Sequence, residues 1–340
     1  MSVAFVTGGS GFVGRALISY LVARGVEVRA LARSGKSAET VRAAGAQVVV
    51  EGDLRGGEGI LNAMKGADVV YHAAAFTQDW GDEQEAWEVT VRGTENMLDD
   101  ARRAGVRRFV HVGTEAVLVD GAPIVRADER RPLPEKPIGL YPRTKAEAER
   151  RVLQANGRGL ETIVTRPRFI WGKGDTTLLP KLIEGAQAGV LRWVGGGTYL
   201  TSTCHIDNVC EGLVKAAERG RPGEVYFLTD GKPVEFRWMI SAMLESQGVT
   251  APAKTIPYWL ARTLSRTTDA LWRALHLRGR PPLPYGSFLL VGHEVTVDDS
   301  KARKELGYES AVSIDAGLRQ MREEMQETRE MQETRAAMRA

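Results

Sequence analysis

Short apolar runs alternate with longer stretches of helical spacing through the first half of the chain. Six runs rich in β-branched residues predict strands, at residues 3–7, 26–31, 47–50, 68–72, 108–112 and 161–165. Between them, apolar residues recur at helical spacing, most clearly over 83–104 and 142–156. This alternation predicts an α/β fold. Its core would be a doubly wound parallel (Rossmann) sheet with helices on both faces, where ligands bind beyond the carboxyl ends of the strands.

The second half is expected to rejoin this sheet once, through an apolar run at 224–229, and otherwise to form a smaller domain. We predict a dinucleotide-binding domain at 1–175 joined by 201–231, a C-terminal substrate-binding cap at 176–200 and 232–318, and a charged tail at 319–340. The cap is rich in aromatic residues, namely Trp193, Tyr199, Trp238, Tyr258, Trp259, Trp272 and Phe288. Large apolar side chains at a cleft favour a small hydrophobic substrate, although most of these rings are expected in the core of the cap.

One stretch of the cap, residues 256–277, places leucines and arginines on different helical faces. The leucines are Leu260, Leu264, Leu271 and Leu275, and the arginines are Arg262, Arg266 and Arg273. This pattern fits a lid, a helix on a membrane surface or a packed amphipathic helix. We prefer the packed helix, which leaves peripheral membrane contact as an open alternative.

The tail carries the sequence Met-Gln-Glu-Thr-Arg twice, at 325–329 and 331–335. An offset of six residues does not keep one stripe on one helical face. We therefore expect a solvated, partly helical extension and assign it no role.

The composition indicates an ordinary soluble protein. Hydrophobic residues make up 43% and charged residues 26%, with a net charge of +3, so nucleic-acid binding is not indicated. The two cysteines, Cys204 and Cys210, form no metal-binding motif, so we expect neither disulfides nor a metal site. Because the first strand starts at residue 3 and no run reaches about 18 apolar residues, we expect no signal peptide, no membrane span and a cytoplasmic setting.

A glycine-rich turn joins the first predicted strand to the first helix. The turn reads Gly8-Gly9-Ser10-Gly11-Phe12-Val13-Gly14. Gly8 and Gly11 would let the backbone turn tightly and approach a pyrophosphate, and Gly14 would let the helix lie close to the strand. The free N–H groups at the helix start, around Phe12 and Val13, would then face the phosphates. The order strand, glycine turn, helix predicts a dinucleotide site.

The second strand is followed by Arg33 and Lys36 rather than by an acidic residue. An acidic residue there would hold the ribose 2′-hydroxyl of NAD, whereas cations suit the 2′-phosphate of NADP. The sequence therefore favours NADP(H) over NAD. The alternative is that Arg33 is only a solvated surface charge.

Two further strand ends carry residues that are expected to contact the cofactor. Asp53 and Leu54 follow the third strand, where the Asp53 carboxylate would accept from the adenine amine, although a plain turn aspartate is nearly as good an interpretation. The small residues Ala73, Ala74 and Ala75 follow the fourth strand. They would let a flat cofactor lie against the backbone, and ordinary core alanines would look the same.

Thr114, Tyr141 and Lys145 form the predicted catalytic group. Thr114 follows the fifth strand, and Tyr141 and Lys145 are four residues apart near the start of a predicted helix, so they share a face. A phenol has a pKa of about 10, and a nearby ammonium would favour the phenolate and lower that pKa. The Thr114 hydroxyl would hold the substrate oxygen where charge develops.

These motifs resemble the extended short-chain dehydrogenase/reductase superfamily, of the NAD-dependent epimerase/dehydratase type, and are most similar to 3β-hydroxysteroid dehydrogenase-like reductases. The resemblance spans about residues 2–318 and includes Arg166–Gly172, His205–Val209 and Asp298–Tyr308. It implies that Tyr141 exchanges a proton with the substrate oxygen and that Lys145 holds the nicotinamide ribose. Thr114 would occupy the family's Ser/Thr position. Pro167, with Ile170 nearby, would lie beside the nicotinamide, and the family implies a homodimer.

Two positions depart from the family pattern. Thr90 stands where Asn is common, which puts an Asn-based water relay in doubt. Glu115 follows Thr114 where sugar dehydratases carry an Asp and then a Glu, but residue 116 is Ala. A dehydratase needs both an acid and a base, so the missing carboxylate counts against that chemistry. Glu115 itself is either a loop carboxylate or a group of unassigned role.

The sequence thus predicts an NADP(H)-preferring oxidoreductase. It would interconvert a ketone and a secondary alcohol on a lipophilic molecule, such as a sterol or a 2-alkyl-3-oxoalkanoate. One alternative is a nucleotide-sugar epimerase or dehydratase with tightly bound NAD. Another, of a different class, is a dinucleotide-binding sensor without catalytic activity.

Overall fold

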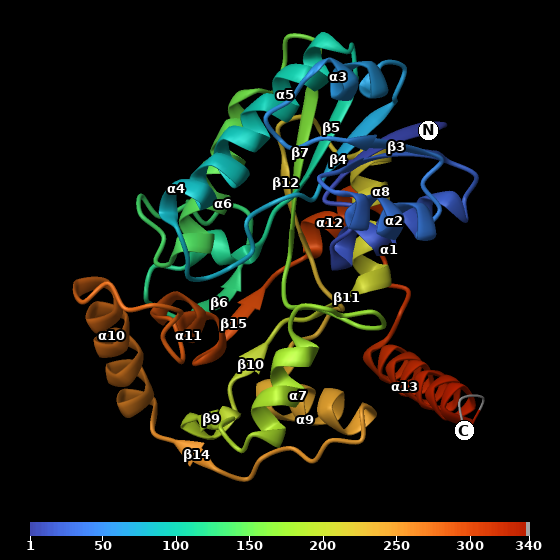
Figure 1. Cartoon of the computed structure of the whole chain (residues 1–340). Helices are drawn as coiled ribbons and strands as arrows, with labels where there is room; N and C mark the ends of the chain where they lie inside the picture. The colour runs from blue at the N-terminus through green and yellow to red at the C-terminus, as the bar shows by residue number, and fades with distance from the viewer. Residues whose placement is uncertain (338–340) are drawn as a thin grey trace.

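A computed structural model describes residues 1–337, with side chains up to residue 334. Its centre is a seven-stranded parallel sheet with the order β12-β7-β5-β4-β1-β2-β3 (Figure 1). The strands are β1 Val3–Thr7, β2 Glu27–Ala32, β3 Val48–Glu51, β4 Val69–His72, β5 Arg108–Val112, β7 Glu161–Pro167 and β12 Val225–Leu228. The predicted fold class is confirmed. All seven predicted runs form strands of this sheet, with ends that shift by one or two residues.

Alternation along the strands explains why helices cover both faces of the sheet. On β1, Ala4 and Val6 point into one apolar core while Phe5 points into the other, since neighbouring residues of a strand face opposite sides. The first core contains α1 (Phe12–Val22), α2 (Gly35–Ala43), α8 (Ile206–Arg219) and α12 (Ser300–Leu306). The second contains α3 (Glu58–Met64), α5 (Gly93–Arg103) and α6 (Leu140–Gln154).

The stretch predicted as one helix over 83–104 has three parts. They are α4 (Glu83–Trp87), the π-helical segment η1 (Glu88–Arg92) and α5. Thr90 lies in the π segment, is fully buried, and accepts a hydrogen bond from Phe76 N at 3.0 Å. This bond fixes the loop after β4. Because π segments often occur near functional sites, we expect the loop to border such a site.

A second, four-stranded sheet has the order β13-β10-β15-β6. It combines β13 (Val234–Glu235), β10 (Leu200–Thr201) and β15 (Val295–Val297) with β6 (Ile124–Ala127), which comes from the first half of the chain. Two short parallel pairs complete the strands, β8 (Ile170–Trp171) with β11 (Cys204–His205) and β9 (Trp193–Val194) with β14 (Thr255–Ile256). The proposed division into domains stays a prediction, but β6 and α12 each pack across its boundaries.

The remaining helices are α7 (Leu179–Gln187), α9 (Phe236–Ser246), α10 (Tyr258–Ala274), α11 (Tyr285–Val291) and α13 (Ile314–Ala337). Two short 3-10 segments are η2 (Glu115–Leu118) and η3 (Gly195–Gly197). Trp193 and Phe288 are buried, as expected for cap aromatics, whereas Trp238 and Trp259 are exposed. Among the described residues, no helix is long and apolar enough to cross a membrane.

The structure differs from the expectation for the leucine stripe of α10. Only Ala261 and Ser265 of this helix are buried. Leu264 and Leu271 are each 48% exposed and Leu275 is 61% exposed. The helix contacts the protein through its small residues, because the leucines lie on a different face from Ala261 and Ser265, so our preference for a packed leucine face is wrong.

The charged end of the chain is more ordered than a solvated extension. α13 is one continuous helix, and Leu318 and Met321 at its start are buried against α9. Further along, Glu324 accepts a hydrogen bond from Gly174 N at 2.9 Å. The helix is therefore attached to the protein before its repeated segment begins. The last three residues of the predicted tail, 338–340, lie outside the described part of the chain.

Candidate active site

The glycine turn between β1 and α1 is packed too closely to accept side chains. Gly8 has φ +70°, and a Cβ added there would lie 2.6 Å from Ala74 N. A Cβ at Gly14 would lie 2.2 Å from Gly8 O. Gly11 is the N-cap of α1, so the N–H groups that follow it, on Phe12 and Val13, start the helix without a capping side chain. We call the turn at residues 8–14, with the adjoining backbone of Ala73 and Ala74, the glycine cradle. It fits a pyrophosphate, which would accept hydrogen bonds from the free N–H groups at the start of α1.

Arg33 lies directly between β2 and α2, at the same edge of the sheet. Arg33 and Lys36 are both exposed, and Ser34 between them caps α2 by accepting from Ser37 N at 3.3 Å. Two exposed cations beside a helix start suit a phosphate group. The arrangement agrees with the predicted 2′-phosphate site.

The residues after β3 and those after β4 differ in whether they contact the glycine turn. Asp53 is already bound by Arg55, whose Nε lies 2.7 Å from Oδ2, and this hydrogen bond holds the pKa of the Asp53 carboxyl below its usual value. Leu54 packs against Gly93. After β4, the backbone of Ala73 and Ala74 touches the Gly8 turn, and Ala75 follows on the same half-buried strand exit. The alanines thus belong to the glycine cradle, while Asp53 is part of a local turn.

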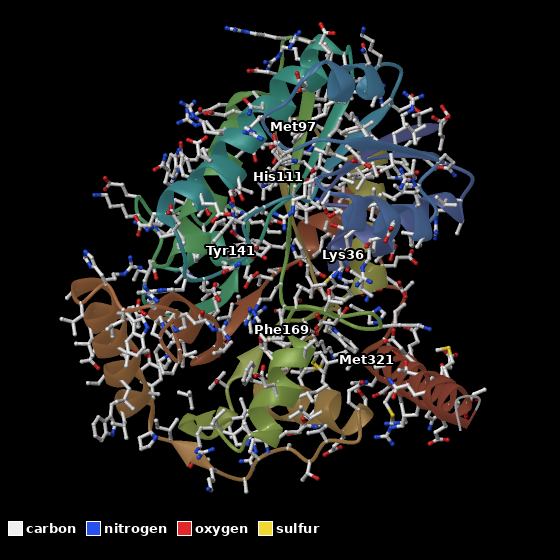
Figure 2. The ribbon with its side chains drawn as sticks, viewed as in Figure 1. Lys36, Met97, His111, Tyr141, Phe169 and Met321 are labelled. Carbon is white, nitrogen blue, oxygen red and sulfur yellow. The ribbon has the colours of Figure 1, made fainter. Side chains whose placement is uncertain are left out.

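Tyr141 and Lys145 lie in the first turns of α6 and face β5. Lys145 Nζ donates to Val112 O at 2.6 Å and lies 3.2 Å from His111 Nε2. Tyr141 is half-buried and lies where the seven-stranded sheet approaches the second sheet and α11 (Figure 2). The phenol and ammonium therefore come from one helix, as the spacing predicts, and both lie near the carboxyl end of β5.

The pKa of Tyr141 is shifted in the direction opposite to our expectation. Burial raises it first, and the negative charge of Glu115 raises it further, while a hydrogen bond with Thr114 opposes the rise. Lys145 does not reverse this, because its ammonium is held by β5, and burial lowers its own pKa to about 8. The phenol is thus a protonated acid at neutral pH. The lowered pKa inferred from the spacing alone is therefore wrong.

Thr114 takes part in a buried polar chain that the sequence did not reveal. Its Oγ1 donates to Glu115 Oε2 at 3.0 Å, and Glu115 Oε1 accepts from Arg168 Nη1 at 2.9 Å. Glu115 and Arg168 are 3% and 4% exposed. Arg168 belongs to the stretch that carries the family resemblance. The sequence offered an arginine in that stretch and a lone carboxylate after Thr114 as the available signal. It does not show that the two side chains form a pair.

The residues expected beside the nicotinamide lie near this chain. Pro167 ends β7 and is paired with Leu228, and Ile170 begins β8. Asp79, from the loop after β4, acts on the pKa of Tyr141 and accepts from Ser287 Oγ of α11 at 2.6 Å. Sequence reasoning missed both Asp79 and Ser287, because their contact joins segments that are 208 positions apart.

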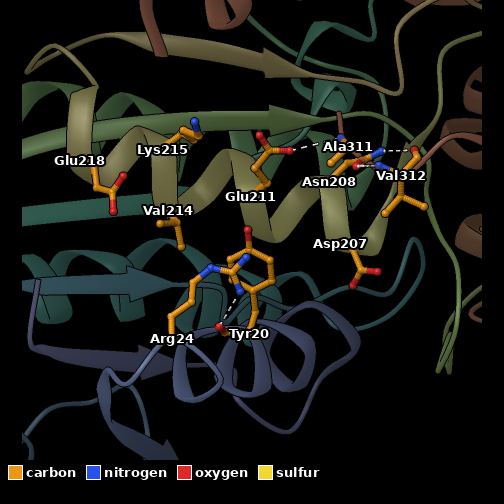
Figure 3. Close-up of a pocket in the computed structure, with 10 residues that line it drawn as sticks. All are labelled: Tyr20, Arg24, Asp207, Asn208, Glu211, Val214, Lys215, Glu218, Ala311 and Val312. Atoms are coloured by element: carbon orange, nitrogen blue, oxygen red, sulfur yellow. Dashed lines mark hydrogen bonds between the residues drawn. The ribbon is translucent and has the colours of Figure 1, made fainter. Parts of the chain in front are cut away.

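Two surface pockets differ in their relation to this site. One is lined by Leu140, next to Tyr141, together with Trp80 and Trp272. The other lies between α1 and α8, where Tyr20, Arg24 and Glu211 line it (Figure 3). Neither of these two pockets is lined by Thr114, Tyr141 or Lys145, but Leu140 of the first pocket directly precedes Tyr141 in the chain. No group of His, Cys, Asp or Glu that could hold a metal ion occurs in the part of the chain that the structure describes.

Comparison with known proteins gives close relatives across nearly the whole chain. The 3-beta hydroxysteroid dehydrogenase/isomerase family matches residues 5–258. A 4-hydroxy-2-methyl-3-oxo-4-farnesyl-3,4-dihydroquinoline-1-oxide ketoreductase of Stigmatella aurantiaca is 51% identical and covers 94% of this chain and 95% of its own. A 2-alkyl-3-oxoalkanoate reductase of Stenotrophomonas maltophilia is 36% identical, with coverages of 93% and 97%.

Solved structures give the same picture of the fold. The dTDP-glucose 4,6-dehydratase DesIV of Streptomyces venezuelae, crystallised with NAD, has a TM-score of 0.74 and 25% identity, and covers 97% of this chain and 98% of its own. The protein gox2253 has a TM-score of 0.75 and 27% identity, with coverages of 95% and 98%. The similarity to the dehydratase concerns the fold.

Proposed function

The chain belongs to the 3-beta hydroxysteroid dehydrogenase/isomerase family, within the extended short-chain dehydrogenases/reductases, and from this premise we propose how its site works. It is an NAD(P)-dependent oxidoreductase that interconverts a ketone and a secondary alcohol on a lipophilic substrate. We propose Tyr141 as the acid/base, Lys145 as the residue that holds the nicotinamide ribose, and Thr114 as the hydroxyl beside them. The observation that supports this proposal is that Lys145, one helical turn after Tyr141, donates to Val112 O at the carboxyl end of β5, just before Thr114 and in the same parallel sheet as the strand that leads into the glycine turn.

Different residues of the chain donate the proton and bind the cofactor during reduction. The bound cofactor supplies a hydride to the carbonyl carbon. As the carbonyl oxygen gains charge, it takes the proton of the Tyr141 O–H group, which burial keeps protonated. Gly8 and Gly14 let the turn pack closely against backbone, and Gly11 is proposed to leave room for the pyrophosphate. The half-buried Ala73–Ala75 segment is proposed to lie against a flat ring of the cofactor. The reverse direction needs the phenolate and is therefore expected to speed up as pH rises.

A lipophilic ketone is the proposed substrate class. The pocket lined by Leu140 presents the rings of Trp80 and Trp272 beside the charged pair of Glu83 and Arg273, and we propose that the rings contact the apolar part of the substrate. Two relatives are a ketoreductase of a farnesylated dihydroquinoline oxide and a 2-alkyl-3-oxoalkanoate reductase. We also propose a homodimer in a cytoplasmic setting. The buried free thiols of Cys204 and Cys210 suit a reducing compartment.

The function is tested by initial rates with NADPH and NADH against three substrates: a steroid ketone, a 2-alkyl-3-oxoalkanoate and a nucleotide sugar. We expect a hydrophobic ketone to be reduced with consumption of the reduced cofactor and the nucleotide sugar to be left unchanged. Conversion of the nucleotide sugar without net cofactor consumption, by a protein that purifies with bound NAD, would instead identify an epimerase or dehydratase.

The proposed preference for NADP(H) rests on Arg33 and Lys36 at the start of α2 and is tested by Arg33→Asp. We expect the ratio of kcat/KM for NADPH to that for NADH to fall by about 10- to 100-fold, because a charge-assisted hydrogen bond to the 2′-phosphate is replaced by repulsion. Arg42→Asp makes the same charge change on the same helix at its far end and is expected to leave the ratio unchanged. An unchanged ratio in Arg33→Asp would show that Arg33 is only a surface charge.

A further inference from the structure

We propose that His111 is a positioning residue, which together with Val112 O holds two of the three N–H groups of the Lys145 ammonium and leaves one for the nicotinamide ribose. This inference rests on the proposed role of Lys145 and adds a residue to its site. Lys145 Nζ donates to Val112 O at 2.6 Å and lies 3.2 Å from His111 Nε2. An ammonium group has three donors and no acceptor, so Nε2 can only accept from it. Because the ammonium is tetrahedral, two fixed N–H groups also fix the direction of the third.

His111 lies at a position of β5 where the strand pattern favours an apolar core residue. Its neighbours Val110 and Val112 belong to the first core, whereas Phe109 belongs to the second core. Residues two apart on a strand share a face, so His111 points to the side of Phe109, where α6 carries Lys145. The imidazole is fully buried and Lys145 is 2% exposed. Packing alone does not require a polar ring at such a position, whereas the contact with Lys145 does.

The contact with Lys145 determines which ring nitrogen of His111 carries the proton. A neutral imidazole has one N–H donor and one acceptor nitrogen, so acceptance at Nε2 places the proton on Nδ1. Nδ1 is buried and has no hydrogen-bond partner among the described residues. A buried donor without a partner is destabilising, but the other tautomer would point its N–H group at the ammonium. The unpaired Nδ1–H group is thus a consequence of using Nε2 to hold Lys145.

The surrounding groups keep the imidazole neutral and leave the ammonium charged at neutral pH. The titratable side chains nearby are Tyr141 and Glu149 of α6, His72 of β4, and Arg166 of β7, which pairs with Glu149. Burial, then Lys145 and His72, hold the pKa of His111 well below its usual value, and burial and Lys145 lower the pKa of His72 to about 3. Burial lowers the pKa of Lys145 to about 8, although the charge of Glu149 raises it. The contact therefore joins a cationic donor to a neutral acceptor below about pH 8.

The first test is the tautomer of His111 in the wild type, measured by ¹⁵N NMR of the imidazole rings. The signals of His111 are identified by their loss in His111→Gln. We expect the proton on Nδ1 at neutral pH, because Nε2 accepts from Lys145. A proton on Nε2 would exclude that acceptance and overturn the proposal. This result does not depend on whether a leucine variant folds.

The second test is the pKa of Lys145 in His111→Leu and His111→Gln, measured by ¹³C NMR of the lysine Cε atoms with Lys145→Met for assignment. Leucine removes an acceptor of the ammonium and keeps the site dry, so we expect the pKa to fall by on the order of one unit. Glutamine offers an amide oxygen at a similar reach to Nε2 and is expected to keep the wild-type pKa. A histidine with a purely structural role predicts the opposite shift for leucine, since a loosened core admits water and raises the pKa toward about 10.4.

The same variants are titrated with NADPH by fluorescence. We expect affinity to fall by about tenfold in His111→Leu, because the ammonium is no longer held for its bond to the ribose, and His111→Gln to restore it. Thr162→Val is the matched control. Thr162 is another fully buried polar side chain between the sheet and α6, and its Oγ1 donates to Val152 O at 2.8 Å, further along the helix than Lys145. Its loss is expected to lower the melting temperature and to leave the Lys145 pKa and NADPH affinity unchanged.

The outcomes separate this inference from the proposed function. If the wild type reduces a ketone and His111→Leu leaves the pKa of Lys145 unchanged or raises it, the positioning role is refuted while the function stands. Wild-type affinity for NADPH in His111→Leu refutes the positioning role as well. If no ketone is reduced, the proposed function fails. The tautomer of His111 and the pKa of Lys145 need no turnover, so they still decide whether His111 holds the ammonium.

Discussion

Tyr141→Phe is expected to lower kcat for ketone reduction by about 10²- to 10⁴-fold, the usual contribution of a positioned general acid. The variant loses the only group that we assign to proton donation, while its ring keeps the packing at the start of α6. Cofactor affinity is expected to change little, because Lys145 and the glycine cradle remain. Fluorescence titration with NADPH, alongside the rate assay, therefore separates a chemical loss from a binding loss.

The control for this variant is Tyr20→Phe, which removes a phenol hydroxyl from the surface groove between α1 and α8. Its activity is expected to equal that of the wild type. Should Tyr141→Phe retain more than about a tenth of the wild-type kcat, proton transfer would have to come from another group, and the assignment of the acid/base would fail. A chain that binds the cofactor, reduces no ketone and keeps its biological role in the Tyr141→Phe variant would favour the sensor without catalytic chemistry.

The structure also bears on the choice between a reductase and a sugar dehydratase. A dehydratase needs a carboxylic acid that can give up a proton next to the substrate. The one acid that this chain has beside Thr114 is committed to Arg168 and Thr114 through both of its oxygens. Fold similarity to a dTDP-glucose 4,6-dehydratase therefore does not by itself imply dehydratase chemistry in this chain. This pairing supports our interpretation that dehydratase chemistry is absent, which was based on Ala116 in place of a second acid.

Local pattern was enough to predict the parallel sheet, because each strand shows its own apolar run and each helix its own periodicity. β5, for example, was predicted at its observed bounds. The two apolar cores, one on each face of the sheet, follow from the alternation of side chains along single strands. The catalytic spacing was equally local, since Tyr141 and Lys145 lie on one helix. The glycine cradle could be inferred because strand, turn and helix are consecutive.

The features that sequence reasoning missed depend on contacts between distant segments. β6 pairs with β15 about 170 residues away, and nothing in its four residues shows which partner it takes. Arg168 meets Glu115 across 53 positions, and the charge of Glu115 adds to the rise of the Tyr141 pKa that burial causes. The leucines of α10 were misjudged because periodicity shows that a helix has a distinct apolar face, but not whether the protein covers that face.

Gly14→Ala is expected to lower the free energy of unfolding by about 3 kcal/mol and NADPH affinity by about 100-fold, although alanine normally favours a helix. The reason is local, since the added Cβ would lie 2.2 Å from Gly8 O and 2.7 Å from Gly9 Cα. Both contacts are with backbone, which cannot move aside without opening the cradle. Thermal denaturation and cofactor titration measure the two effects.

Two other glycines of the chain make this prediction specific. At Gly11 the nearest atom to an added Cβ is Gly8 O at 3.3 Å, and its φ of −78° is ordinary. Gly11→Ala is therefore expected to keep its stability and lose about tenfold in NADPH affinity, since the methyl group would stand where the pyrophosphate approaches. Gly35→Ala, in open space at the start of α2, is expected to change neither. If Gly14→Ala proved as stable as the wild type, α1 would not pack against the turn as described. If Gly11→Ala bound NADPH normally, the pyrophosphate would have to lie elsewhere.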